Sequence, residues 1–244
     1  MACLSLFSSN QEAVNGRQST MKIDLHLHTL YGSACAYMDP DQLINQAKSV
    51  GLDGVCITEH NQIWEQKAIE NLQKKHDFLV IGGVEVSTDL GEILAFGLHE
   101  PVLEIYYAGD LRKMVDEAGG YMVMAHPFRS EPDLFSTYSS SGGEVLSQNI
   151  RELSARPVFG LVDAMEVFNG RAGFKETAFT EAAAAYLNLA GTGGSDAHAI
   201  LGVGACYTWF EEPIANEQDL IDQLKKGRFF GVDDRWKKES RVTF

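Results

Sequence analysis

The chain has 244 residues, of which 45% are hydrophobic and 22% charged, the proportions of an ordinary soluble globular protein whose core needs no cross-links. Its formal net charge of −14 disfavours strong nucleic-acid affinity, which depends on many Lys and Arg side chains that neutralise phosphates. No apolar stretch approaches the roughly 20 residues of a membrane span. The four cysteines form no Cys-x-x-Cys pair, so we expect a reducing, cytoplasmic environment.

The first part of the chain differs from the rest. Residues 1–20 are polar and aperiodic, and they contain no apolar core of the length that a signal peptide requires. A strand pattern then starts directly at Met21. We therefore expect a flexible N-terminal extension over residues 1–20, followed by one domain over residues 21–244.

Strand and helix patterns alternate through this domain. Residues 22–28 predict a first strand, and a helix follows over 40–50, with Asp39 as its N-cap and Gly51 as its stop. Further strands are expected at 54–58, 78–88, 121–125, 158–167, 189–192 and 203–209, a hairpin addition at 92–98, and further helices at 63–75, 110–118, 175–186 and 217–226. Seven strands alternating with helices predict an α/β fold, a mostly parallel barrel that is closed or nearly closed.

One stretch breaks this alternation. Residues 129–143 are rich in Ser, Gly and Pro, which is the composition of a loop, and they follow directly on a predicted strand end at His126. A loop of about 15 residues inside a compact domain is more often functional than idle. Residues 129–143 are therefore a candidate lid over a site, with a plain surface loop as the alternative.

Histidines and carboxylates gather at the predicted strand ends. The set comprises His26, His28, His60, His126 and His198, together with Glu85 and Asp196. Imidazole and carboxylate are the ligands that divalent transition metals prefer. The carboxyl ends of the strands are also where a βα barrel builds its active site. The sequence therefore predicts a metalloenzyme.

The spacing of these residues suits shared ions. His26 and His28 are two apart on a strand, so both side chains point to one face and can reach one ion. Asp196 and His198 repeat this spacing after a glycine-rich segment. Glu85 lies between valines, where a buried carboxylate costs several kcal/mol unless it is paired or metal-bound, and its two oxygens can bridge two ions. The alternatives are polar core histidines, an Asx turn and a buried salt bridge.

Other polar residues lie near the same strand ends. Asp24, one strand period before His26, is a candidate to orient an imidazole. Glu166 and Asn169, at the end of the fifth strand, could complete a ligand set. His76 and His99 lie at a helix end and after the hairpin, and we place both outside the site.

These motifs, taken together and in order, resemble those of the PHP (polymerase and histidinol phosphatase) family. They are His26-Leu-His28, Thr58-Glu-His60, Gly83-Val-Glu85, Ala125-His-Pro127 and Ser195-Asp-Ala-His198. The resemblance covers about residues 21–210, and the tail over about 203–244 is similar to the C-terminal segment of small stand-alone members. It implies a single-domain, distorted seven-stranded (β/α)7 barrel, similar to a TIM barrel.

The resemblance also implies two or three divalent ions, Mn, Fe or Zn, and a ligand set. His26, His28, Glu85 and Asp196 would hold one ion, Glu85 would bridge to a second ion held by His126, and His60 and His198 would hold a third. Many members have an Asp or His shortly after the His-x-His, but residues 30–35 here contain neither, with Cys35 as a speculative substitute. A second-site histidine of some members is also replaced, with Asn169 or Glu166 as the nearest candidates.

The predicted activity is hydrolysis of a small phosphorylated metabolite or nucleotide, with a metal-bridging hydroxide as the nucleophile. Arg129 and Arg171 are the candidate phosphate-binding residues, because guanidinium matches phosphate geometry, and solvated surface arginines are the alternative. Glu85 and Asp196, which would hold the ions, are the predicted catalytic residues together with Arg129. We expect no membrane partner.

Three other functions remain open. An amidohydrolase barrel also begins with His-x-His, but it usually has a bridging lysine where Glu85 lies and a lone aspartate where the Asp196-Ala-His198 motif lies. A phosphotyrosine phosphatase of the PHP type is the second alternative. The third is a catalytically inactive metal-binding scaffold, which would be expected to have lost several ligands. Nearly all ligand positions are filled here, which favours an enzyme.

Overall fold

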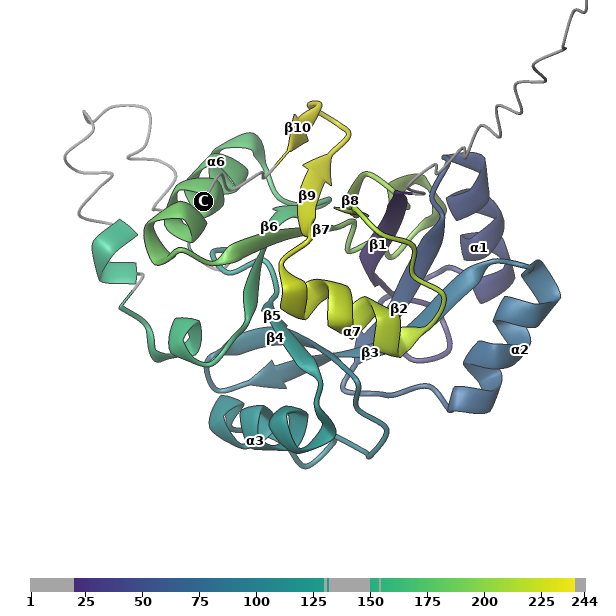
Figure 1. The fold of residues 1–244 in the computed structure, drawn as a ribbon, viewed down its shortest axis with the longest axis horizontal. Coiled ribbons are helices and arrows are strands. Elements are labelled where there is room, and N and C mark those ends of the chain that lie inside the picture. Colours follow the sequence, from purple (N-terminus) through teal and green to yellow (C-terminus); the bar gives the residue numbers. More distant parts are fainter. Residues whose placement is uncertain (1–19, 130, 132–149, 154, 240–244) are drawn as a thin grey trace, which may run out of the picture.

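The computed structural model describes residues 20–129, 131, 150–153 and 155–239 (Figure 1). Apart from Thr20, Arg129 and Glu131, the predicted extension (residues 1–20) and the candidate lid (residues 129–143) lie outside the described residues. Within the described ranges, no helix is long and apolar enough to cross a membrane.

The strands form one sheet of order β10-β9-β8-β1-β2-β3-β4-β5-β6-β7. Their bounds are β1 Met21–Leu27, β2 Gly54–His60, β3 Leu79–Thr88, β4 Gly91–Phe96, β5 Tyr121–Met124, β6 Ala164–Asn169, β7 Ala190–Gly194, β8 Cys206–Phe210, β9 Phe229–Asp233 and β10 Lys238–Glu239. Most central strands are buried along their whole length, because helices cover one face and the barrel interior the other. This is an α/β fold in a single domain, as predicted.

The sheet differs from the predicted seven-stranded, mostly parallel barrel. It has ten described strands, because β4 inserts between β3 and β5 and because β8, β9 and β10 extend the sheet beyond β1. The pairs β1–β2, β2–β3, β5–β6 and β6–β7 are parallel. The other five pairs are antiparallel, so the predictions of strand number and of mostly parallel pairing are wrong. The hairpin addition predicted at residues 92–98 corresponds to β4, which pairs with both β3 and β5 inside the sheet.

The sheet curls until the segment after β7 meets β1, which nearly closes a barrel. The backbone N–H of Asp196 donates to the carbonyl of His26 at 2.7 Å, and that of His28 donates to the carbonyl of Ala197 at 3.2 Å. Leu27 and Ala197 form an isolated parallel bridge at this seam. Closure therefore joins the two segments that carry most of the predicted ligands.

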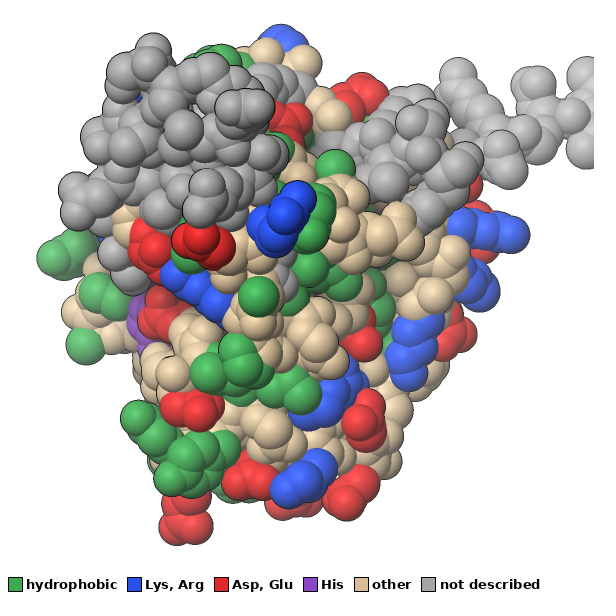
Figure 2. All heavy atoms as spheres, turned by 90° about the vertical axis from the view of Figure 1, so that its left-hand side faces the viewer, with side chains coloured by type: hydrophobic (Ala, Val, Ile, Leu, Met, Phe, Trp, Pro, Cys, Tyr) green, Lys and Arg blue, Asp and Glu red, His purple; other side chains and the backbone are tan. Residues whose placement is uncertain are grey.

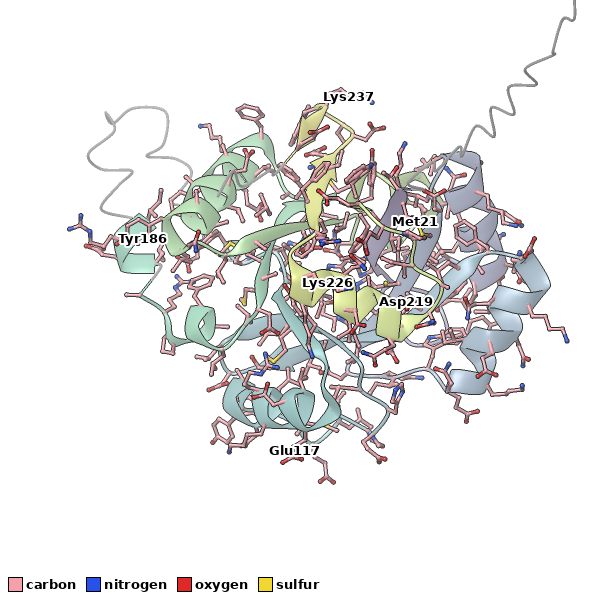
Figure 3. The ribbon with its side chains drawn as sticks, in the orientation of Figure 1. Met21, Glu117, Tyr186, Asp219, Lys226 and Lys237 are labelled. Atoms are coloured by element: carbon pink, nitrogen blue, oxygen red, sulfur yellow. The ribbon has the colours of Figure 1, made fainter. Side chains whose placement is uncertain are left out.

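Helices surround the barrel and cover one end of it. They are α1 Pro40–Ser49, α2 Gln66–His76, α3 Ala108–Ala118, α6 Phe174–Leu187 and α7 Glu217–Lys226, with 3₁₀ turns at Pro157–Gly160 and Ile200–Gly202. Figure 1 shows α7 in front of the strands, and Figure 3 labels Asp219 and Lys226 on it. Leu220 and Leu224 of α7 pack in one buried cluster with Ile23, at the start of β1, and Phe96, at the end of β4. The helix α7 thus covers the end of the barrel opposite the carboxyl end of β1.

Two local predictions have different outcomes. Asp39 caps α1, because its side chain accepts a hydrogen bond from the N–H of Asp41 at 2.9 Å, and Gly51 follows the helix with a φ of +81°. The strand predicted at 158–167 instead begins as a 3₁₀ turn, and β6 starts only at Ala164. Pro157 explains this difference, because its fixed φ suits the first position of a helical turn.

Replacing Gly193 by Ala should destabilise the fold by at least about 2 kcal/mol, because backbone atoms cannot relieve the clash. A Cβ there would collide with the carbonyl oxygen of Tyr207 and lie 3.2 Å from the nitrogen of Val232. Chemical denaturation is the measurement. Gly109→Ala, near the start of α3 where a Cβ meets nothing within 4 Å, is the matched control and should be neutral or stabilising by up to about 1 kcal/mol. Equal changes in unfolding free energy for the two variants would mean that Gly193 is not packed against Tyr207 and Val232, and would contradict the barrel closure.

Candidate metal centre

The seven predicted ligands converge at the carboxyl end of the barrel. Four overlapping groups have donor atoms that all lie within 4.8 Å of one another: His28–His60–His198, His26–His126–Asp196, His26–His28–Glu85 and His60–Glu85–Glu92. Each predicted ligand takes part in at least one group that could hold an ion. Glu92, on β4, was not predicted.

Glu85 is the centre of the cluster, and its side chain is fully buried. Its Oε1 lies 3.0 Å from Nε2 of His126, and its Oε2 lies 3.0 Å from Nδ1 of His60. The same Oε2 lies 3.3 Å from Nε2 of both His26 and His28. One carboxylate thus faces four imidazoles that come from three strand ends.

Three buried atoms in this cluster lack a hydrogen-bond partner, namely Nε2 of His26, Nε2 of His28 and Oε2 of Glu85. The two nitrogens are within ion-pair distance of the oxygen but do not have hydrogen-bond geometry toward it. A buried polar atom without a partner costs about 1–3 kcal/mol, so native proteins rarely leave one. A divalent cation placed among the three would satisfy all of them, and the donor set therefore fits a metal site.

Protonation in the cluster follows from burial and from the close charges. Burial by itself would lower the pKa of His26, but the carboxylates of Glu166, Glu85 and Asp196 outweigh it and hold that pKa well above its ordinary value. Burial would raise the pKa of Glu85, but the surrounding histidines hold it well below its ordinary value. The pKa of Asp196 is likewise low, because His26, His28 and Arg129 outweigh burial. Both carboxylates are therefore charged and available to a cation.

A second carboxylate, Glu166, fixes the ring of His26. Its Oε1 accepts from Nδ1 of His26 at 2.9 Å, and its Oε2 accepts from the backbone N–H of His126 at 2.9 Å and from Nδ2 of Asn169 at 3.0 Å. With a proton on Nδ1, His26 presents Nε2 to the cluster, which is the usual arrangement of a carboxylate behind a metal-binding histidine. Both oxygens of Glu166 accept hydrogen bonds, so in this arrangement it positions two candidate ligands, His26 and His126.

His28 is fixed by a relay from the fully buried Glu59. Ser33 donates to Oε2 of Glu59 at 2.5 Å, and its oxygen lies 3.2 Å from Nδ1 of His28. Because the single Ser33 proton goes to Glu59, His28 must donate from Nδ1, which leaves its Nε2 lone pair facing Glu85. Residues 30–35, which lack the Asp or His that many family members have there, therefore contribute this hydroxyl instead.

The two predicted phosphate-binding arginines lie beside the cluster. Nη2 of Arg129 lies 2.7 Å from Oδ2 of Asp196 and donates to Oδ1 of Asn169 at 2.7 Å. Nη1 of Arg171 lies 3.4 Å from Nδ1 of His198 and 3.9 Å from Oδ1 of Asp196. Arg129 is held by two acceptors, whereas Arg171 is more than half exposed. Asn169, considered as a ligand, instead ties Arg129 to the cluster.

Arg235, near the C-terminus, holds the loop that carries Asn169 and Arg171. Its guanidinium donates to the carbonyls of Asn169, Gly170 and Ala172 at 2.5–3.0 Å. It also forms a bidentate pair with the fully buried Asp233, at 2.7 and 3.0 Å. The sequence contains no signal for this contact, which depends on β9 lying against the loop after β6.

Two site residues have strained backbones. His126 has a φ of +23° and Asp196 a φ of +51°, values that residues with side chains adopt at a cost of about 1–3 kcal/mol. Such strain persists only where surrounding contacts enforce it, here the bond from the N–H of His126 to Glu166 and the bond from the N–H of Asp196 to His26. Both residues open onto a cavity of ≈ 590 Å³ that also contains Cys35 and Tyr37 in its lining.

Three other sequence predictions have clear outcomes. Asp24 does not orient an imidazole: it accepts from the backbone N–H groups of His26, Ser195 and Gly204, and burial raises its pKa to about 6. Cys35 lies in none of the ligand groups formed by the described residues. His76 and His99 pair with Asp41 and Glu217, away from the cluster, in agreement with the prediction.

The fold and this site define an α/β barrel with a candidate metal centre, and comparison of sequences gives the family. The PHP domain profile matches residues 24–198, and the PHP-associated profile matches residues 179–229. The chain therefore belongs to the PHP family. An uncharacterised protein of Methanocaldococcus jannaschii is 29% identical over 117 residues, which cover 44% of this chain and 68% of that protein.

Solved structures with this fold include PsfC from Pseudomonas syringae PB-5123, with a TM-score of 0.57, 21% identity and coverage of 83% of this chain and 88% of that one. A two-domain protein of Bacteroides vulgatus, described as containing a predicted PHP-like metal-dependent phosphoesterase, gives a TM-score of 0.64 at 20% identity. That match covers 88% of this chain and 65% of the longer protein. At these identities the likeness shows a shared fold.

Saturating Mn²⁺ or Zn²⁺ should raise the melting temperature of chelator-treated protein. A ligand at about 1,000 times its Kd stabilises by about 4 kcal/mol, roughly 8–16 °C for a chain of this size. His28→Asn should lose most of the shift, because it removes one of the unpartnered nitrogens. His99→Asn, at an exposed histidine outside the cluster, should keep it. An equal shift in the two variants would place the ion elsewhere.

Arg235→Met should destabilise the protein by about 2–4 kcal/mol, because it leaves the buried Asp233 without its charge partner. Arg228→Met removes an exposed ion pair with Glu212 and should cost less than about 1 kcal/mol. Urea denaturation of the metal-free proteins measures both. Similar losses in the two variants would show that Arg235 has no special role in holding the loop.

Proposed function

We propose that the protein is a metal-dependent phosphoesterase that acts on a small phosphorylated metabolite or nucleotide. The observation that carries the proposal is the set of three unpartnered buried atoms, on His26, His28 and Glu85, beside a cavity whose lining includes Glu85, Arg129 and Arg171. Buried atoms that lack a partner thus lie next to guanidinium donors, and Glu85 joins the two sets because it lines the cavity. A substrate with both a metal-seeking and an arginine-seeking group, such as a phosphate, suits this combination.

The ligand set would hold the ions as follows. His26, His28, Glu85 and Asp196 would hold one ion, Glu85 would reach a second beside His126, and the group of His60 and His198 with His28 would hold a third. Bound divalent ions would supply a nucleophilic water of lowered pKa and would neutralise charge on phosphoryl oxygens. Glu166 and the Glu59–Ser33 relay would keep the Nε2 atoms of His26 and His28 directed at the ions.

The arginines would bind the phosphate. Arg129 is already oriented by Asp196 and Asn169 through one terminal nitrogen, which leaves its other donors for a phosphoryl oxygen. Arg171, which lines the cavity and is more than half exposed, would reach the same group from the loop after β6. Guanidinium groups placed in advance lose little entropy on binding, so they favour productive orientation.

The cavity and the surface favour a small substrate. A volume of ≈ 590 Å³ is typical of pockets for metabolites. On the face drawn in Figure 2, acidic and basic side chains of the described residues are interspersed and not gathered by sign. With a net charge of −14, this distribution is unlike the basic strip that binding of nucleic acid by its phosphates uses.

The test is a hydrolysis assay on protein purified without chelators, with metal content measured in parallel by plasma mass spectrometry. We expect two or three ions per chain and turnover of p-nitrophenyl phosphate or of members of a nucleotide and sugar-phosphate panel. Glu85→Ala should lower kcat by at least about 10³-fold, because it removes the shared ligand. Arg129→Met should mainly raise KM, by roughly 10-fold or more, and Arg228→Met should change neither constant.

Other results would identify a different function. Bound metal with hydrolysis of amides but not phosphoesters would indicate an amidohydrolase. Selective turnover of phosphotyrosine peptides would indicate a protein phosphatase. Bound metal without any turnover, after reloading with Mn²⁺, Fe²⁺ and Zn²⁺ in turn, would indicate a scaffold. If the chain bound no metal, the proposal would be contradicted, because every step of it assumes a bound ion.

A further inference from the structure

We propose that Glu92 is a metal ligand and that it completes, with Glu85, His60 and His126, an ion site that the strand-end motifs leave incomplete. The inference rests on the proposed function only in assuming that Glu85 holds a metal. It adds a residue outside every motif that identified the chain. It also assigns to β4 a chemical role in addition to its place in the sheet.

The first argument is distance. The donor atoms of His60, Glu85 and Glu92 all lie within 4.8 Å of one another, the separation expected of atoms that surround one ion. Oε2 of Glu92 lies 3.5 Å from Nε2 of His126, which in turn lies 3.0 Å from Oε1 of Glu85. Glu92 therefore lies within reach of an ion shared with His60 and Glu85, and His126 contacts both carboxylates from beside them.

The second argument is hydrogen-bonding capacity. Nε2 of His126 lies between two carboxylates, but a ring nitrogen offers one proton or one lone pair and can satisfy only one of them. Oε2 of the fully buried Glu85 has no hydrogen-bond partner and faces the same space. A cation shared by the two carboxylates and the imidazoles satisfies all of these atoms at once.

The third argument is charge. The carboxylate of Glu92 has no Lys or Arg within 4.0 Å among the described residues, and its one ion-pair partner there is His126. It lies on the wall of the cavity together with His60, Glu85 and His126. Its side chain is 37% exposed at this wall, so a cation that enters the cavity can reach the carboxylates of both Glu92 and Glu85.

The topology explains why Glu92 was missed. In a parallel strand only the last residues reach the carboxyl end of a barrel, so a pattern of strand-end residues does not include the start of a strand. The strand β4 runs antiparallel to β3, with Ser87 opposite Glu92 in the register. The first residues of β4 therefore lie at the level of the last residues of β3, and Glu92 enters the site from the start of its strand.

The site that Glu92 completes and the group of His28, His60 and His198 should then prefer different metals. A site with two carboxylates and imidazoles offers harder ligands than the group of His28, His60 and His198, which is made of imidazoles alone. Oxygen-rich sites favour Mn²⁺, whereas imidazole suits Zn²⁺ or Fe²⁺. We therefore assign Mn²⁺ or a similarly hard divalent cation to the site that Glu92 completes.

The experiment measures Mn²⁺ binding by the full chain with Glu92→Gln, which keeps the size of the side chain and removes its charge. Chelator-treated protein is titrated with Mn²⁺ and bound ions are counted by equilibrium dialysis and by paramagnetic resonance. We expect about one ion per chain fewer in Glu92→Gln than in the natural chain, with the remaining ions unchanged. Glu100→Gln, at an exposed position after β4, is the matched control and should bind as the natural chain does.

Glu92→Asp keeps the charge but withdraws the carboxylate by one methylene group. This variant should weaken the binding of the same Mn²⁺ ion by at least about tenfold. It takes the place of Glu92→Gln as the test if circular dichroism shows that Glu92→Gln does not fold. Equal Mn²⁺ number and affinity in the natural chain and the folded Glu92 variant would overturn the inference while leaving the phosphoesterase proposal intact. If the natural chain bound none of Mn²⁺, Zn²⁺ and Fe²⁺, both the inference about Glu92 and the phosphoesterase proposal would be contradicted.

Discussion

One buried charge, the carboxylate of Glu85, constrains the rest of the structure. It lies in the interior of a ten-stranded sheet among four histidines, where an uncompensated charge would be too costly to keep. Its neighbours therefore have to come from other strands, and they do so from β1, from β2 and from the segment after β5. The barrel closure between His26 and Asp196 adds a second carboxylate to the same cluster.

Several of the candidate ligands are positioned by a partner from another part of the chain. Glu166 fixes His26, the Glu59–Ser33 relay fixes His28, and Arg129 fixes Asp196. Gly194 lets β7 approach this layer, since a Cβ there would lie 2.7 Å from Oε1 of Glu166. Side chains held in this way would not have to be ordered for a cation or a phosphate to bind, which is the physical meaning of a preformed site.

The antiparallel strands contribute more than extra width to the sheet. The strand β4 brings its first residues, and with them Glu92, to the level of the ligand cluster. The strand β9 ends at Asp233, and the pair of Asp233 with Arg235 holds the loop that carries Asn169 and Arg171. The parallel part of the barrel thus provides most of the imidazoles, and the antiparallel parts set the charge and rigidity around them.

The sequence by itself determined the α/β class, most element positions and the seven strand-end residues that converge, because periodicity and residue type are local properties of the chain. It also determined the family, since five motifs in order are specific. Only the tertiary structure decided the number and direction of the strands, the roles of Glu166, Ser33 and Arg235, and the approach of Glu92. Pairing direction and contacts such as that of Arg235 with Gly170 depend on how distant segments pack, and no local pattern encodes them.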